Sequence, residues 1–455
     1  MVLFSVQIYL NLFYNVYFRH KLYHLSLNIF KQLISLSKQE KGWIAFDWAN
    51  SSYQLSITSA LFPAFYHVVS KKMNHVVTIG NTDFSATSVY AFTMSAAFLT
   101  VAIIVPYLSS IADYTGRRKL FMIIFTSLGA FSAMGLGFLS NNFGLGLLFF
   151  YLATVGYAGS LTFYNSFLPL ITTKDQVDRL SALGYSFGYI GSVILLIFNL
   201  ITISFPSFFG LPNELAALQV SFVVVGLWWF GFAQITFKRL PQYAFGNQLK
   251  EKNWWKGYQE IVLVWKEFKS NKILVRYLLA YFFCIAGILT VMYMAANFGK
   301  KELNLKDGVL IPTVLLIQLF GIHGAMLCSS FSKKVGNIKT LSVVMFIWTL
   351  ICFAAYFVNN AWQFILLAIS VGYVMGGAQS LLRSTYAKLL PETKDHTSYF
   401  SFFDVVERLA MIVGLFGFGL IEQLTGSMRL SIVLIAVLFI AGQLVLVTLR
   451  KLKLT

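Results

Sequence analysis

The sequence predicts an all-α integral membrane protein of about twelve transmembrane helices in two six-helix halves. Hydrophobic residues make up 58% of the 455 residues, and charged residues only 11%. The mean hydropathy of +0.71 excludes an ordinary soluble domain. Most apolar residues fall in runs of about 20, the length of helix that crosses the hydrocarbon core of a bilayer.

The apolar runs divide the chain into four parts. Residues 1–42 form a basic amphipathic extension, which we expect to lie on the membrane surface; an extra span, or a start codon placed too far upstream, are the alternatives. Residues 43–237 form the first half, with spans near 43–69, 87–108, 120–140, 145–170, 181–204 and 217–237. Residues 238–272 form a linker, and residues 273–455 the second half with a short basic tail. Its spans lie near 273–298, 309–331, 340–358, 361–389, 399–421 and 428–449.

A short charged turn, residues 109–119, joins the second and third spans. It contains Asp113, Gly116, Arg117 and Arg118. Glycine permits the tight reversal, and the cations place the turn in the cytoplasm by the positive-inside rule. We expect Asp113 to hold the Arg pair or a neighbouring helix start, and so to gate the inner side.

The chain repeats this turn at an offset of 220 residues. Residues 329–339 match it at two serines, one glycine and the final lysine, with Lys333 in the place of Asp113. The same offset carries residues 173–175 onto 393–395. Both matches lie in predicted loops at the same phase of the span pattern, which favours two related halves.

The net charge of +18 reports topology, because the cations gather in alternate loops. Both termini and the linker are therefore expected in the cytoplasm. The linker interleaves lysines with Trp254, Trp255 and Trp265, a pattern typical of an amphipathic helix on an anionic membrane surface. Membrane lipids are thus expected partners and nucleic acid is not, although a regulatory or nucleic-acid role for the linker is the alternative.

Polar residues inside the spans are the candidates for a substrate or coupling site. Asp47, Ser51, Gln54 and Thr58 recur at helical spacing and form one stripe on the first span. Lipid cannot satisfy these groups, so the stripe should face protein or a water-filled cavity. A shallow capping role is the alternative for the acid. Deeper groups in the eighth span are Gln318 and His323, and His323 can titrate near neutral pH or simply be hydrogen-bonded.

Charged residues also occur in the tenth and eleventh spans. Arg383 shares a helix face with Gln379, and Asp404 shares one with Glu407 and Arg408. Pairing between helices would close an inner gate. A local Asp404–Arg408 pair and a snorkelling Arg383 are the alternative.

Several motifs resemble a known family. Asp-x-x-Gly-Arg-Arg-Lys at 113–119 resembles the signature loop of the major facilitator superfamily of secondary transporters. Other motifs resemble the vacuolar-effluxer-like branch of this superfamily. They are Asp-Trp-Ala-Asn-Ser-Ser-Tyr at 47–53, which includes Asn50, Phe-Pro at 62–63, and residues 376–386, 390–391, 402–406 and 423–427. The resemblance implies the major facilitator fold, alternating access and a monomer that moves a small solute. Fungal members of this branch are associated with amino-acid release from the vacuole.

No pattern indicates catalysis or a cofactor. The sequence has no Gly-rich phosphate loop, no metal-spaced His/Cys cluster and no nucleophile elbow. We therefore expect a transporter of a small polar solute, with protons as a candidate coupling ion and amino acids as a candidate substrate. Export of sugars, peptides or drugs, a membrane-embedded enzyme, a channel and a non-transporting receptor are the alternatives. The expected location is the cell membrane, or the vacuolar membrane for a fungal source.

Overall fold

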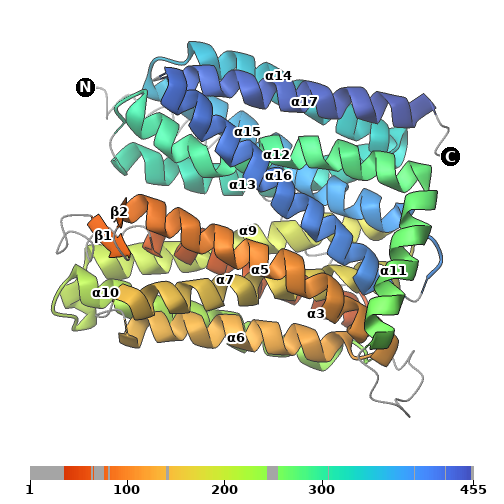
Figure 1. Cartoon of the computed structure of the whole chain (residues 1–455). Helices are drawn as coiled ribbons and strands as arrows, with labels where there is room; N and C mark the ends of the chain where they lie inside the picture. The colour runs from red at the N-terminus through yellow and green to blue at the C-terminus, as the bar shows by residue number, and fades with distance from the viewer. Residues whose placement is uncertain are drawn as a thin grey trace.

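The computed structural model describes residues 35–62, 65, 76–79, 82–139, 143–242, 255–305, 307–393, 395–425 and 427–451. Most of the N-terminal extension, residues 243–254 of the linker with Trp254, and Pro63 lie outside these residues. Two groups of long helices lie side by side in the described part of the chain (Figure 1).

The first half begins with α3 (Lys38–Ser52), which continues as the π-helix η2 (Tyr53–Leu61). The next long helices are α5 (Ala86–Thr115), α6 (Arg118–Leu139), α7 (Phe143–Ser166), α9 (Val177–Ser204) and α10 (Glu214–Arg239). Short elements connect them: β1 (Val76–Ile79), β2 (Thr82–Ser85), α8 (Leu168–Ile171) and η3 (Pro206–Phe209). The β1–β2 antiparallel hairpin, paired from Val76 with Ser85 to Ile79 with Thr82, was not expected from the sequence.

The second half follows α11 (Trp255–Ser270). It consists of α12 (Lys272–Lys301), α13 (Asp307–Val335), α14 (Asn337–Phe357), α15 (Ala361–Leu389), α16 (His396–Thr425) and α17 (Met428–Lys451). Among the described residues, ten helices are long and apolar enough to cross a membrane. With α3–η2 and α16 they account for the twelve expected spans, so the predicted all-α membrane fold is confirmed.

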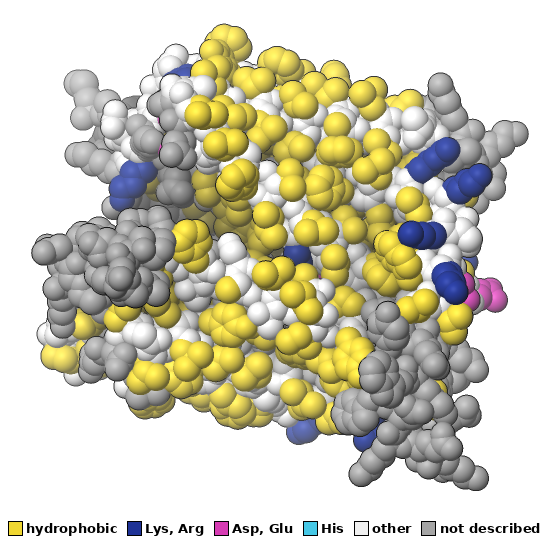
Figure 2. All heavy atoms as spheres, viewed as in Figure 1, with side chains coloured by type: hydrophobic (Ala, Val, Ile, Leu, Met, Phe, Trp, Pro, Cys, Tyr) yellow, Lys and Arg dark blue, Asp and Glu magenta, His cyan; other side chains and the backbone are white. Residues whose placement is uncertain are grey.

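The side chains on the outer surface of the bundle indicate what surrounds it. Large apolar side chains such as Ile103, Phe138 and Phe416 are between 67% and 74% exposed on the helices. Apolar side chains cover the middle of the face in Figure 2, and cations gather toward the edge where α11 lies. A soluble protein rarely exposes so large an apolar surface, so this band faces lipid.

The two repeated turns use the same backbone device. Gly116, between α5 and α6, has a φ of +67°, and Gly336, between α13 and α14, has a φ of +89°. A side chain at either position would be strained, because this backbone region favours glycine. Both turns therefore bring consecutive helices back antiparallel after one or two residues.

Two helix groupings form the interface between the halves. Helix α9 packs against α13 and α15, and α16 packs against α5 and α7. Helix α11 lies across the end of the bundle and contacts α5, α12 and α16 (Figure 1). Its Phe268 is buried against Tyr399 and Phe402, whereas Leu263 and Trp265 are exposed.

Candidate functional site

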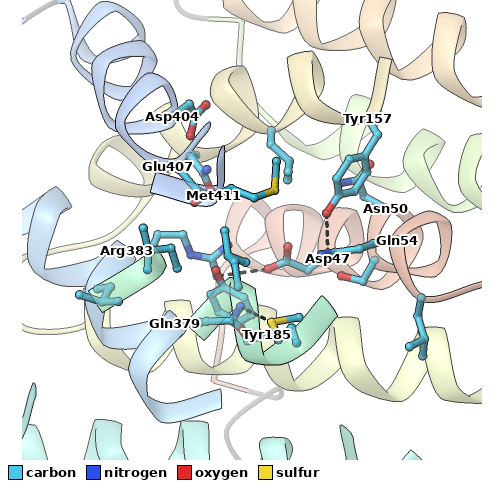
Figure 3. A pocket seen from close by; sticks show the side chains of 18 of the residues that line it. Asp47, Asn50, Gln54, Tyr157, Tyr185, Gln379, Arg383, Asp404, Glu407 and Met411 are labelled. Atoms are coloured by element: carbon cyan, nitrogen blue, oxygen red, sulfur yellow. Dashed lines mark hydrogen bonds and ion pairs between the residues drawn. The ribbon is translucent and has the colours of Figure 1, made fainter. Parts of the chain in front are cut away.

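A polar cavity lies between the two halves. Its volume is about 140 Å³. Its polar and charged lining comes from both halves (Figure 3): Asp47, Asn50, Ser51, Gln54, Ser59, Tyr157, Asn165, Tyr185, Tyr189, Ser192, Tyr281, Tyr293, Gln318, Gln379, Arg383, Asp404, Glu407 and Arg408. Most of the side chains that the sequence singled out therefore meet in one place.

A buried ion pair joins the first span to the tenth at this cavity. Arg383 on α15 donates from Nη2 to Oδ2 of Asp47 on α3, over 3.2 Å. It also donates from Nε to Oγ of Ser181 and from Nη2 to the Ser181 carbonyl, each over 3.0 Å. The guanidinium carbon lies 4.7 Å from the Trp43 ring centroid and 4.2 Å from that of Tyr185. Arg383 therefore does not snorkel, but is held by the first half.

The polar stripe on the first span differs from the expected one at its C-terminal end. Asp47, Asn50, Ser51 and Gln54 line the cavity, and Gln54 accepts a 2.7 Å hydrogen bond from Tyr157. The next lining residue is Ser59, whereas Thr58 is buried outside the cavity. The expectation of Thr58 assumed α-helical spacing. In η2 the helical hydrogen bonds run between residues i and i+5, so side chains leave the positions that α-helical spacing gives them, and the Ser59 hydroxyl donates to the Gln54 carbonyl.

The expectation of His323 at the cavity is wrong. Its ring packs near Phe320 and Tyr373, with centroid distances of 6.3 and 6.2 Å, and its Nδ1 lies 3.3 Å from the Leu319 carbonyl. Gln318 on the same helix does line the cavity. Five residues rotate an α-helix by about 500°, so the two side chains leave α13 roughly 140° apart.

Two glutamines complete the second-half side of the cavity. Gln379 accepts a 2.8 Å hydrogen bond from the Tyr189 hydroxyl, which crosses between α9 and α15. Gln318 is buried, and its Oε1 has no hydrogen-bond partner in the described residues. The same holds for Oδ1 of Asn50 and of Asn165. Three amide side chains at the cavity wall therefore have a buried oxygen without a hydrogen-bond partner in the described part of the chain.

Two carboxylates on α16 accept hydrogen bonds from hydroxyl groups. Asp404 contacts the hydroxyl of Thr162 on α7, in the first half. Glu407 contacts the hydroxyl of Tyr281 on α12, in its own half. The helix thus presents two acids to the cavity, one turn apart.

Arg408 does not pair with either of these acids. Its Nη2 donates to the Ala158 carbonyl on α7 over 3.3 Å, and its guanidinium carbon lies 4.8 Å from the Phe98 ring centroid on α5. The alternative of a local Asp404–Arg408 ion pair is therefore wrong in this structure. These contacts cross between the halves instead, at the cavity.

The signature turn holds the two halves together at the end of the bundle where α11 lies. Asp113 is buried and accepts from Nε of Arg118 over 2.6 Å, within the first half. It also accepts from the backbone N–H groups of Thr397 and Ser398, over 3.3 and 2.8 Å, and from the Ser398 hydroxyl over 2.9 Å. A carboxylate at the N-terminus of α16 satisfies otherwise unpaired donors and complements the helix dipole. Arg117, the other cation expected to contact the acid, is exposed and Arg118 takes this place.

A second contact between the halves was missed from the sequence. Asp178, at the start of α9, is buried and accepts from the Ser332 hydroxyl over 3.1 Å and from Asn337 Nδ2 over 2.7 Å. Nζ of Lys388 lies 2.5 Å from its Oδ2. The acid belongs to the first half and all three partners to the second, so this is another lock between the halves.

The internal repeat carries the signal for this second lock. The offset of 220 residues places Ser398 on Asp178, and Asp113 on Lys333. In one lock the acid lies on the turn and the serine at the helix start. In the other the acid lies at the helix start, and Ser332, next to Lys333, lies on the repeated turn. The acid has moved to the opposite partner of an equivalent contact.

Comparison with known proteins places this architecture in a family. Residues 37–453 match the family described as vacuole effluxer Atg22 like. An MFS-type transporter of Bacillus subtilis, YxiO, is 29% identical over 413 residues, which cover 90% of this chain and 94% of that protein. Autophagy-related protein 22 of Saccharomyces cerevisiae is 23% identical over 470 residues, covering 86% and 87%.

Solved structures agree on the fold. The major facilitator transporter FucP in its outward conformation superposes with a TM-score of 0.68 at 14% identity, covering 90% of this chain and 97% of that chain. The xylose symporter XylE gives a TM-score of 0.63 at 13% identity, covering 92% and 95%. The relatives are transporters and not enzymes. The chain therefore belongs to the Atg22-like vacuole effluxer family and is a multi-pass membrane transporter of the major facilitator superfamily.

Proposed function

We propose that the protein moves a small polar solute across its membrane by alternating access, with the cavity between the halves as the solute site. One observation carries this proposal: side chains of both charge signs line one cavity at the interface, together with three amide side chains whose oxygens have no hydrogen-bond partner in the described residues. Burying such groups without partners costs about 0.5–3 kcal/mol each even on mild scales. A bound solute or water removes that cost.

We propose amino acids as the solute class. Arg383 and Arg408 offer guanidinium groups to a carboxylate, and Asp404 and Glu407 offer acceptors to an ammonium group. The tyrosine rings of the wall suit an apolar side chain, with hydroxyl groups at their edges. A sugar could hydrogen-bond to the amides and hydroxyls but has no charged group to pair with the arginines and acids, so it is the weaker candidate.

We propose that the two inner locks, with Asp113 and Asp178, hold the cytoplasmic side closed in the conformation described. Their contacts cross between the halves and cannot survive if those ends separate. The same proposal places α11 on the cytoplasmic side with the inner ends of the helices, against membrane lipids. It requires only one copy of the chain and uses a proton gradient as the driving force.

Transport in proteoliposomes tests the proposal. Purified protein is reconstituted and offered a pooled library of amino acids, sugars and short peptides, with and without a pH gradient, and the trapped solutes are identified by mass spectrometry. We expect selective accumulation of amino acids that depends on the gradient. Arg383→Gln, which leaves Asp47 without its ion pair, should abolish it, while Asp175→Asn on an exposed loop is the matched surface control. Selective accumulation of another solute class would contradict the substrate proposal, and no selective movement of any solute would contradict transport through this cavity.

A further inference from the structure

The acids that line the cavity outnumber the arginines by one. Asp47, Asp404 and Glu407 are acids, whereas Arg383 and Arg408 are the cations that line it. Asp47 and Arg383 neutralise each other in a buried ion pair. The remaining three groups all lie on α16, and if all are ionised they leave one uncompensated negative charge.

The α16 acids have no cation at ion-pair distance in the described residues. In the described part of the chain, Asp404 accepts from the hydroxyl group of Thr162 and Glu407 from that of Tyr281. Arg408 points its Nη2 to a backbone carbonyl of α7, and its buried Nε has no hydrogen-bond partner there. Asp404 and Arg408, which could neutralise one another, are thus held apart by contacts with the first half.

Such an arrangement favours a neutral acid. Burying an ionised carboxylate without a cation costs several kcal/mol, and a second carboxylate one turn away adds repulsion. A buried acid that keeps its proton avoids both the burial cost and the repulsion. Asp47 is not in this position, because it has a cation, Arg383, at ion-pair distance.

Among the described residues that line the cavity, the other cation besides Arg408 is Arg383, which is already paired with Asp47. The titratable and charged side chains near the cavity on neighbouring elements are Asp47 on α3, Tyr157 on α7, Tyr185 and Tyr189 on α9, Tyr281 and Tyr293 on α12, and Arg383 and Tyr386 on α15. The nearest acids on α5 and α11, Asp113 and Glu267, contact the start of α16 instead, through Ser398 and Tyr399. Helix α17 has no charged residue between Arg429 and Arg450.

We propose that Asp404 is the residue that binds and releases the coupling proton, and that Arg408 is the cation that replaces this proton. Asp404 is preferred to Glu407 because it is only 6% exposed and because its hydroxyl partner belongs to the opposite half. When the halves part, α16 loses Thr162 and Ala158 together. Asp404 and Arg408, four residues apart, then face each other along the helix.

The proton step balances in this scheme. In the conformation described, the Asp404 carboxyl keeps its proton and shares a hydrogen bond with Thr162. After the halves separate, the O–H bond breaks, the proton passes to water on the open side, and Arg408 pairs with the new carboxylate. The net charge of the site falls by one unit, which is the charge carried away by the proton. The inference rests on the proposed transport function and names the residue that couples it to protons.

Infrared spectroscopy tests the site without any substrate. A protonated carboxyl group has a carbonyl stretching band separate from that of a carboxylate, so a pH titration of the purified protein should show one buried carboxyl losing its proton. We expect Asp404→Asn to remove this band and Asp404→Glu to move it. Asp47→Asn, Glu407→Gln and the loop control Asp175→Asn should keep it. A band that persists in Asp404→Asn, or that disappears only in Glu407→Gln, overturns the assignment.

Exchange measurements separate this inference from the proposed function. The rate of solute exchange across proteoliposomes should depend on pH in the parent and lose that dependence in Asp404→Asn, whatever its absolute rate. If the parent transports a solute and Asp404→Asn keeps the parent's pH dependence, the inference fails and the transport proposal stands. If the band behaves as expected but the parent moves no solute, the transport proposal fails instead.

Discussion

Replacing Asp113 with asparagine should open the cytoplasmic side of the transporter. Only contacts that differ between conformations shift the balance between them. The Arg118 contact lies within the first half and persists in both states, whereas those to Thr397 and Ser398 cross to α16. The amide turns one of two acceptor oxygens into a donor that faces donors. The magnitude therefore comes from the α16 contacts alone.

Hydrogen bonds to a charged group contribute about 1.5–3 kcal/mol. Losing one such contact to α16 should raise the inward-open population by about 10- to 150-fold relative to the closed one. Expression should stay near normal, because the isosteric amide keeps the packing of the buried site. The control Asp175→Asn makes the same chemical change on an exposed loop of the same face.

Labelling of a single cysteine measures the shift. Cys284, Cys328 and Cys352 are first replaced, since all three are free thiols. A cysteine in place of Asn165, which lines the cavity, is then exposed to a membrane-impermeant maleimide from either side of oriented vesicles. In the Asp113→Asn background, labelling from the cytoplasmic side should become faster and labelling from the other side slower. An unchanged ratio of the two rates would refute the locking role.

Three further predictions follow from contacts at the inner ends and in the second half. Asp178→Asn should shift labelling in the same direction as Asp113→Asn. The double variant should shift it further, because the two locks bond different helices. A double variant that labels like either single variant would argue against two locks. Gly376→Ala should strongly lower the yield of folded protein in size-exclusion profiles, since a Cβ there would lie 2.1 Å from the Gly321 carbonyl oxygen. The control Gly419→Ala should not lower the yield, because a Cβ there would have no atom within 4 Å. Equal yields would contradict the close packing of α13 against α15. Burial, reinforced by the Arg118 charge, lowers the pKa of His396 to about 4 from 6.5, so the unfolded chain binds this proton first and stability should fall as pH drops from 6.5 toward 4. Thermal unfolding of His396→Gln should lose part of that acid sensitivity, and a pH profile identical to the parent's would contradict it.

The sequence predicted the spans well because their signal is physical and local. A run of about 20 apolar residues must lie in lipid, and glycines at the repeated turns mark where helices reverse. The observed helices begin and end close to the expected bounds. The same local signal could not reveal the β1–β2 hairpin, whose eight residues lie within a long loop between spans.

The candidate site depended on rotation and on long-range contacts, which one sequence fixes poorly. Gln318 faces the cavity and His323 does not, although both are polar groups in the same apolar helix. Thr58 was misplaced because nothing in the local sequence announced the wider turn of η2. Asp178 was overlooked because its partners lie at least 154 residues away, although the 220-residue repeat pointed to its position.

Distances between the ends of the two halves test the alternating-access account most directly. Spin labels at Asp175 and Lys339 report the cytoplasmic ends, and labels at Pro212 and Trp362 report the opposite ends; all four residues are exposed. We expect the cytoplasmic distance to increase and the other to decrease when a transported solute and a lower pH are supplied together. The Asp113→Asn variant should show the same two changes without solute. If both distances stay fixed under every condition, or change in the same direction, the two halves do not rock about the cavity and the account is contradicted.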